Sequence, residues 1–149
     1  MVWQYDIPGV ARSKKNSNRI VNVKGRTMVL PSAAYKAYER QCGQYLTNKP
    51  KKPIDFPCEV TCIYFIPRNK DGSIPKKKLD LCNLLAASHD ILVKYKILED
   101  DNSSIVFSVD GSRVYYTTGE PHTLILIRSI DEDTESESGR HSDGEDSAR

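Results

Sequence analysis

The sequence lacks the features that would place it among membrane, secreted or multidomain proteins. No run approaches the ~18 to 20 apolar residues that a membrane helix requires. The first residues form neither a basic nor an apolar region, so we expect no secretory signal and a cytoplasmic location. The length of 149 residues excludes two independent enzymatic domains. We therefore expect one domain with a modest core.

The four cysteines also lack the spacing of a redox or zinc-binding motif. Only Cys58 and Cys62 are close together, and no C-x-x-C pair is present. The histidines, His89, His122 and His141, have no zinc-like spacing either. This pattern favours reduced, mostly packed thiols over a structural zinc site.

The chain as a whole lacks a large excess of charge of either sign, since its net charge is +2. This small total hides an uneven distribution along the sequence. Residues 1–78 hold sixteen basic and five acidic side chains, whereas residues 79–130 hold four and seven. Residues 1–130 together therefore carry +8. A basic first half beside an acidic patch is typical of a nuclease, in which cations neutralise phosphates and carboxylates hold metal. A structural protein without a nucleic-acid partner fits this distribution poorly.

The segment 131–149 differs in composition from the rest of the chain. It holds eight acidic and two basic side chains and no large apolar residue. Such a segment cannot bury enough surface to offset its ordering entropy, so we expect an acidic disordered tail after a folded domain of residues 1–130. The tail either promotes solubility or imitates DNA and competes for the basic face.

The folded part is predicted to alternate strands and helices. Strands are expected over residues 2–7, 19–23, 27–30, 58–66, 105–109 and 122–130, with helices over residues 32–46 and 80–95. Gly25 would form a hairpin turn, and Ser32 would cap the first helix. The order strand, hairpin, helix, strand, helix, strand, strand predicts an α+β fold, with a small mixed sheet and two helices packed on it.

The second predicted helix, residues 80–95, has two distinct faces. Asp80 begins the helix, where the free N–H groups favour a negative charge. Cys82, Ala86 and Asp90 follow one another at intervals of four residues, on one stripe. The side that should face the sheet consists of Leu81, Leu84, Leu85, Ser88, Ile91 and Leu92.

Four aspartates belong to this helix and the loop after it: Asp80, Asp90, Asp100 and Asp101. If the loop folds back, their oxygens form a site suited to Mg²⁺ or Mn²⁺, which could orient a water and stabilise charge on a scissile phosphate. The alternative is structural, with a helix cap, a solvated aspartate and an acidic turn. The spacing by itself leaves both interpretations open.

Several segments resemble one family of nucleases. Residues 80–84 (D-L-C-N-L), 90–92 (D-I-L) and 100–101 (D-D) resemble the D-L-D-N-L, D-x-L and D-D signature of RusA-type Holliday junction resolvases. Residues 13–17 (S-K-K-N-S) and 31–35 (P-S-A-A-Y) resemble a loop and a helix start of its phage and prophage branch. The resemblance covers most of residues 4–130, in order.

This resemblance implies a homodimeric, Mg²⁺- or Mn²⁺-dependent endonuclease that cuts four-way and other branched DNA in recombination, repair or phage DNA processing, in the bacterial host cytoplasm. By position, Asp80 and Asp101 match metal ligands, and Asp90 matches an acidic catalytic position. Asp100 is either a further ligand or a neighbour that adjusts Asp101. Contacts with DNA phosphates are expected from Lys14, Lys15, Asn16, Lys76, Lys77 and Lys78.

Two residues depart from the commonest family pattern. Cys82 stands where that pattern has a second Asp, and Ala86 stands where it has a catalytic Lys. A methyl group can neither bind a metal nor donate a proton, so Ala86 marks either a natural loss of activity or a substitution introduced to trap the enzyme. Two hypotheses follow: an active resolvase, and a resolvase-like protein that binds branched DNA without cutting it.

Overall fold

The fold is given by a computed structural model that describes residues 1–14, 18–76 and 79–130. The expectations for the tail 131–149 and for Lys15, Asn16, Lys77 and Lys78 lie outside these ranges. The elements are β1 (Val2–Pro8), β2 (Asn18–Val23), β3 (Arg26–Pro31), α1 (Ala33–Tyr45), β4 (Cys58–Pro67), α2 (Leu81–Lys94), β5 (Val106–Ser108), β6 (Arg113–Thr117) and β7 (His122–Ser129). The predicted mixed α+β fold with two helices is confirmed.

The main sheet is built around β4. This strand pairs antiparallel with β7, which pairs antiparallel with β1, and its other edge pairs in parallel with β5 and β6. Strand β6 was not predicted. This run of five residues pairs along its length with Ile63–Pro67, which lies far away in the sequence. Such a pairing leaves no local periodic signal.

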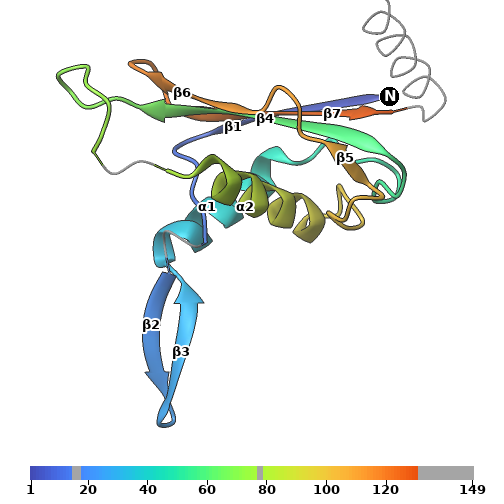
Figure 1. Cartoon of the computed structure of the whole chain (residues 1–149). Helices are drawn as coiled ribbons and strands as arrows, with labels where there is room; N and C mark the ends of the chain where they lie inside the picture. The colour runs from blue at the N-terminus through green and yellow to red at the C-terminus, as the bar shows by residue number, and fades with distance from the viewer. Residues whose placement is uncertain (15–17, 77–78, 131–149) are drawn as a thin grey trace, which may run out of the picture.

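Both helices cover one face of this sheet (Figure 1). Side chains of β4 alternate between buried and half-buried along the whole strand, as expected when the helices cover one of its two faces. The phenol of Tyr64 shares a hydrogen bond of 2.7 Å with the Ser88 hydroxyl of α2, so the buried side of β4 faces that helix. Neither helix has the length and apolar character needed to cross a bilayer, as far as the described residues show.

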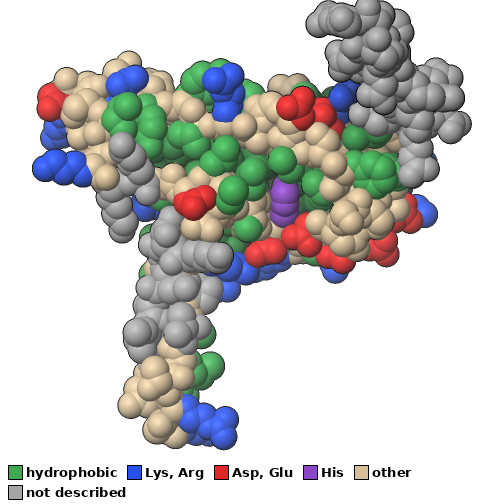
Figure 2. Space-filling view, in the orientation of Figure 1, with side chains coloured by type: hydrophobic (Ala, Val, Ile, Leu, Met, Phe, Trp, Pro, Cys, Tyr) green, Lys and Arg blue, Asp and Glu red, His purple; other side chains and the backbone are tan. Residues whose placement is uncertain are grey.

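The predicted hairpin forms a separate two-stranded ribbon, β2–β3, that projects from the body beside α1 (Figure 1). Its two-residue turn has positive φ angles at Lys24 (52°) and Gly25 (78°), as tight hairpin turns require. Lys24 and Arg26 are exposed at the tip, where Figure 2 shows basic side chains at the far end of the ribbon. The hairpin therefore carries positive charge away from the core.

The two helices are joined by a buried carboxylate. Glu39 of α1 accepts a hydrogen bond from Lys94 of α2 and forms a second ion pair with Lys36. Burial by itself raises the pKa of Glu39, but the hydrogen bond and the charge of Lys94 outweigh this effect. The pKa of Glu39 therefore lies below its ordinary value.

The helices also approach closely at Gly43 of α1. A Cβ at this position would lie 2.5 Å from the ring of Tyr95, which follows α2, so the close contact requires glycine.

Candidate functional site

Asp80 forms the N-terminal cap of α2. Its Oδ1 accepts hydrogen bonds from the backbone amides of Cys82 (2.8 Å) and Asn83 (3.4 Å). Cys82, Ala86 and Asp90 are exposed along the helix, as their spacing predicted. The opposite face is buried through Leu84, Ala87, Ser88, Ile91 and Leu92, whereas Leu81 and Leu85 are only partly buried. This exposed stripe, Cys82, Ala86 and Asp90, is therefore open to a substrate.

The loop after α2 folds back on the helix. The amides of Ile97 and Leu98 both donate to the carbonyl of Leu92, at 2.9 and 3.2 Å. Lys96 adopts the left-handed conformation, with φ of 66°, which helps to reverse the chain. The Glu99 amide then donates to the Ile54 carbonyl, at 3.0 Å, and this fixes where Asp100 and Asp101 begin. The chain thus reverses its direction directly after α2.

Asp100 and Asp101 lie in a turn beside α2. The Asp100 carboxylate accepts hydrogen bonds from the Asp101 amide (2.8 Å) and from the Asn102 side chain (2.9 Å). These bonds hold the pKa of Asp100 below its ordinary value. Figure 2 shows acidic side chains gathered along the border of the face that carries α2 and this loop. The turn therefore presents negative charge next to the helix.

His89 is a residue near the site that the sequence analysis did not single out. Burial lowers its pKa, while the charges of Asp101 and Asp90 act in the opposite direction. Its Nε2 is buried and has no hydrogen-bond partner within the described part of the chain. The proximity of His89 to Asp101 depends on the loop reversal, so no local sequence pattern could have predicted it.

Asp90 forms an ion pair with Lys14, which lies in the segment after β1. The distance between Lys14 Nζ and Asp90 Oδ2 is 3.4 Å. Both residues line a cavity of about 150 Å³ together with Asn83, Ala86 and Ala87. Lys76, in the segment before α2, is exposed to solvent. Of the two predicted phosphate contacts that the structure describes, Lys14 therefore lies at the exposed stripe of α2.

The donor set fits a hard cation in chemistry, since Mg²⁺ and Mn²⁺ prefer carboxylate oxygens. Among residues 1–14, 18–76 and 79–130, no three His, Cys, Asp or Glu side chains are grouped closely enough to hold one ion. Asp80 and Asp90 are ten residues apart in one helix, about 15 Å along its axis, so they cannot share an ion. The arrangement fits an ion that has one or two protein ligands and completes its shell with water and phosphate.

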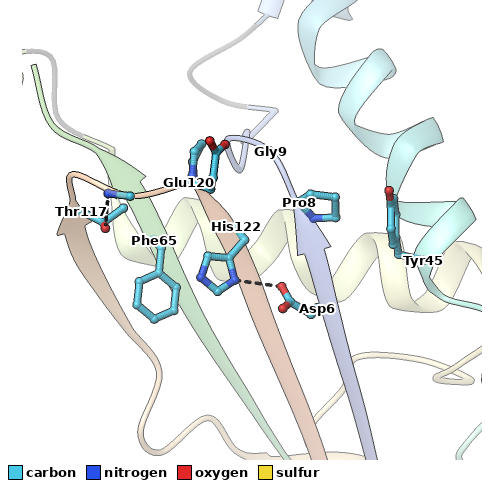
Figure 3. Close-up of a pocket in the computed structure, with 10 residues that line it drawn as sticks. Asp6, Pro8, Gly9, Tyr45, Phe65, Thr117, Glu120 and His122 are labelled. Atoms are coloured by element: carbon cyan, nitrogen blue, oxygen red, sulfur yellow. Dashed lines mark hydrogen bonds and ion pairs between the residues drawn. The ribbon is translucent and has the colours of Figure 1, made fainter. Parts of the chain in front are cut away.

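A separate hollow lies at the end of the sheet where β1 stops and β7 starts (Figure 3). It has a volume of about 780 Å³. His122 Nδ1 lies 2.9 Å from Asp6 Oδ1, and the His122 ring stacks on Phe65 with centroids 4.4 Å apart. Within the part of the chain that the structure describes, no predicted catalytic, metal-binding or DNA-binding residue lines this hollow. The stacked rings of Phe65 and His122 belong to residues paired directly across β4 and β7.

The cysteines give a direct test of the site's exposure. Burial raises the pKa of the Cys42, Cys58 and Cys62 thiols to about 11, whereas Cys82 is exposed at the start of α2. Because the thiolate is the reactive form, we expect a thiol reagent at pH 8 to label Cys82 alone in the folded protein. Peptide mass spectrometry would identify the labelled cysteine, and labelling in urea should reach all four. Fast native labelling of Cys42 would contradict the packing of α1.

A known family of proteins matches most of this chain. The family model of endodeoxyribonuclease RusA matches residues 8–128. The match spans the β2–β3 hairpin, both helices, the aspartate-bearing loop and nearly all of β7. The comparison with individually curated proteins gave no match. The resemblance inferred from the sequence is confirmed, and the chain belongs to the RusA family of Holliday-junction-resolving endodeoxyribonucleases.

Proposed function

We propose that this chain is an active, metal-dependent resolvase that cuts four-way and other branched DNA by phosphodiester hydrolysis. The observation that carries the proposal is the arrangement around α2. Asp80 caps the helix, and the returning loop presents Asp100 and Asp101 beside it. Lys14 adds a positive charge over the exposed stripe. Carboxylates and a lysine on one solvent-facing surface are the groups that phosphodiester hydrolysis needs.

In this proposal Asp80 and Asp101 hold Mg²⁺ or Mn²⁺, and Asp100 is a third ligand or the neighbour that orients Asp101. The helix cap uses Oδ1 of Asp80 and leaves Oδ2 for an ion. When bound, such an ion lowers the pKa of a water and stabilises charge on the phosphate that is attacked. The helix cap at Asp80 and the Leu92-anchored loop support this assignment.

Basic segments after β1 and before α2 would contact the DNA backbone. Lys14 and Lys76 are exposed, and Lys15, Asn16, Lys77 and Lys78 adjoin them in the sequence. Contacts with phosphates carry no base information, so the shape of the junction would dominate recognition. A homodimer with twofold symmetry would place two such sites on a four-way junction, which accounts for paired cuts by a small domain.

The alternative function is a protein that grips branched DNA without cutting it. Cys82 and Ala86 favour this alternative, because neither exposed side chain supplies a carboxylate or an ammonium group on the α2 stripe. The retained carboxylates favour the enzyme; they are Asp80, Asp90, Asp100 and Asp101. The two hypotheses differ in one observable, the appearance of nicks.

A junction assay with Mg²⁺ and with Mn²⁺ separates these functions. We expect symmetrically placed nicks in a labelled four-way junction and none in a matched linear duplex. Binding should weaken steeply with salt: for six to ten phosphate contacts, affinity falls about 10³- to 10⁵-fold between 50 and 200 mM salt. Tight junction binding without nicks, with cutting restored by Ala86→Lys or Ala86→Glu, would establish the binding protein instead. Equal affinity for junction and duplex, or binding independent of salt, would argue against both.

We also infer that residues 1–130 form the nuclease domain and that residues 131–149 form a separate acidic tail. The family match ends at residue 128, which supports this boundary. The tail, with its excess of acidic side chains, would aid solubility or compete with DNA for the basic face. The resemblance to the phage and prophage branch supports action on branched DNA in the cytoplasm of a bacterial host.

A further inference from the structure

The cavity on the exposed side of α2 has a feature that the metal-binding carboxylates do not explain. It measures about 150 Å³ and is lined by Lys14, Asn83, Ala86, Ala87 and Asp90. The single methyl group of Ala86 forms part of its wall, so a longer side chain at this position would enter it. A lysine ammonium and an asparagine side chain border a space that opens on the surface of α2.

Lys14 is held at this cavity from three directions. Its Nζ lies 3.4 Å from Asp90 Oδ2 and 5.7 Å from the centre of the Tyr35 ring, a cation–π contact. The backbone on its N-terminal side is anchored, since Ala11 and Ser13 are 2% and 1% exposed. The Lys14 side chain nevertheless stays 45% exposed. The ammonium is therefore positioned by the fold and still accessible to a ligand.

Stability does not account for this arrangement. Ion pairs between exposed side chains contribute little to folding, and the Asp90 side chain is as exposed as that of Lys14. A phosphate oxygen, in contrast, attracts a lysine ammonium as a point charge and accepts a hydrogen bond from an asparagine amide. The pairing of Lys14 with Asn83 at one small cavity matches a phosphate better than it matches a structural contact.

The place of the cavity along α2 links it to the carboxylates. The backbone N–H of Asn83 donates to Oδ1 of Asp80 at 3.4 Å, so Asn83 is in the first turn of the helix that Asp80 caps. Asp90 lies two further turns along, too far from Asp80 to share an ion, and its partner is Lys14. The helix thus separates the candidate metal ligand Asp80 from a second, cationic subsite.

We propose that this cavity binds a non-bridging oxygen of the DNA phosphate that is cut, with Lys14 and Asn83 as its contacts and Asp90 as the positioning residue of Lys14. The proposal rests on the proposed nuclease function. Lys14, which comes from the loop after β1, thereby provides the positive charge that α2 does not carry on its own exposed stripe. Asp90 acts through Lys14 and does not contact the metal.

The proposal is tested by removing the charge of Lys14 and then by placing a new lysine at position 86. In full-length protein, Lys14→Met keeps an unbranched stem against Tyr35 and removes the charge. We expect the single-turnover rate of junction cleavage at saturating protein to fall about 100-fold, the lower end of the loss when one preorganised charge-stabilising donor is removed. Junction affinity should change only a few-fold, because one phosphate contact among several is lost. Lys51→Met, which removes an exposed lysine between α1 and β4 that lies outside the cavity and is not among the proposed phosphate contacts, is the matched control and should leave the saturated rate unchanged.

Rescue decides whether the cavity itself is the site. In Lys14→Met/Ala86→Lys, the new side chain enters the same cavity from α2, and we expect cleavage to recover to within about tenfold of the original rate. Ala86→Lys by itself should give no acceleration, because the cavity already has its cation. Acceleration by Ala86→Lys in the otherwise unchanged chain, or failure of the double variant to recover while its thermal unfolding is unchanged, would overturn the proposal.

The role of Asp90 is tested by a double-mutant cycle. Asp90→Asn should lower the saturated cleavage rate about tenfold when Lys14 is present and should have no further effect in the Lys14→Met background. Additive losses would show that Asp90 acts independently of Lys14. If the unaltered chain cuts junctions and Lys14→Met cuts equally fast, the cavity proposal fails and the nuclease function stands. If the unaltered chain never cuts, the nuclease function fails and the cavity proposal fails with it.

Discussion

Replacing Asp80 with asparagine is expected to abolish junction cleavage while the protein still folds and binds DNA. Asparagine is as good a helix cap as aspartate, so the bonds to the Cys82 and Asn83 amides have a substitute acceptor. The lost carboxylate charge removes a ligand for the divalent ion. Because altering even the partners of metal ligands commonly costs 10- to 100-fold, we expect the cleavage rate to fall by roughly 100-fold or more.

The measurement is single-turnover cleavage of a labelled four-way junction, beside a band-shift assay without divalent ion. Asp101→Asn should give the same result, since the returning loop presents Asp101 on the same side of the fold as α2. Asp110→Asn is the matched control, because Asp110 is an exposed aspartate in a different turn. Cleavage by Asp80→Asn at a rate close to that of the Asp110 control would remove Asp80 from the mechanism.

Leu92→Ala is expected to have the largest effect on stability. Leu92 is fully buried in the last turns of α2, and deletion of such a leucine side chain lowers the free energy of unfolding by about 2 to 5 kcal/mol. The Leu92 carbonyl also anchors the loop that carries Asp100 and Asp101. Loss of packing at this turn should therefore reduce cleavage at temperatures where the α2 end begins to fray.

Urea unfolding followed by circular dichroism would measure the change. Ile74→Ala is the control, since Ile74 is 45% exposed and substitutions at such positions usually change stability by less than about 0.5 kcal/mol. Equal stability of the Leu92 and Ile74 variants would contradict the packing of α2 on the sheet.

Local features of the fold could be predicted because their causes lie within a few residues. Ser32 and Asp80 cap the two helices, as their positions before apolar-periodic segments indicated. Gly25 forms the hairpin turn, where a positive φ is needed. Cys82, Ala86 and Asp90 lie on one exposed stripe because 3.6 residues form a turn of helix. These features follow from backbone geometry alone.

Other features depend on contacts between distant segments. β6 is held by pairing with β4, whose residues precede it by about fifty positions, and a short edge strand has little periodicity of its own. His89 and Asn83 acquire their surroundings from the returning loop and from the segment after β1. The ion pair between Lys14 and Asp90 joins residues 76 positions apart. No spacing rule relates such residues, because packing on the sheet decides which of them meet.

By itself, the sequence determined the division of charge between a basic half and a carboxylate-bearing helix, the caps and faces of both helices, and the likeness to RusA nucleases. Only the tertiary structure decided that the loop after α2 turns back through the Leu92 carbonyl and that Lys14 reaches Asp90. The physical reason is the separation in sequence over which each kind of interaction acts. Capping and periodicity act between neighbours in the chain, whereas the approach of Lys14 to α2 is fixed by the sheet on which both β1 and α2 are anchored.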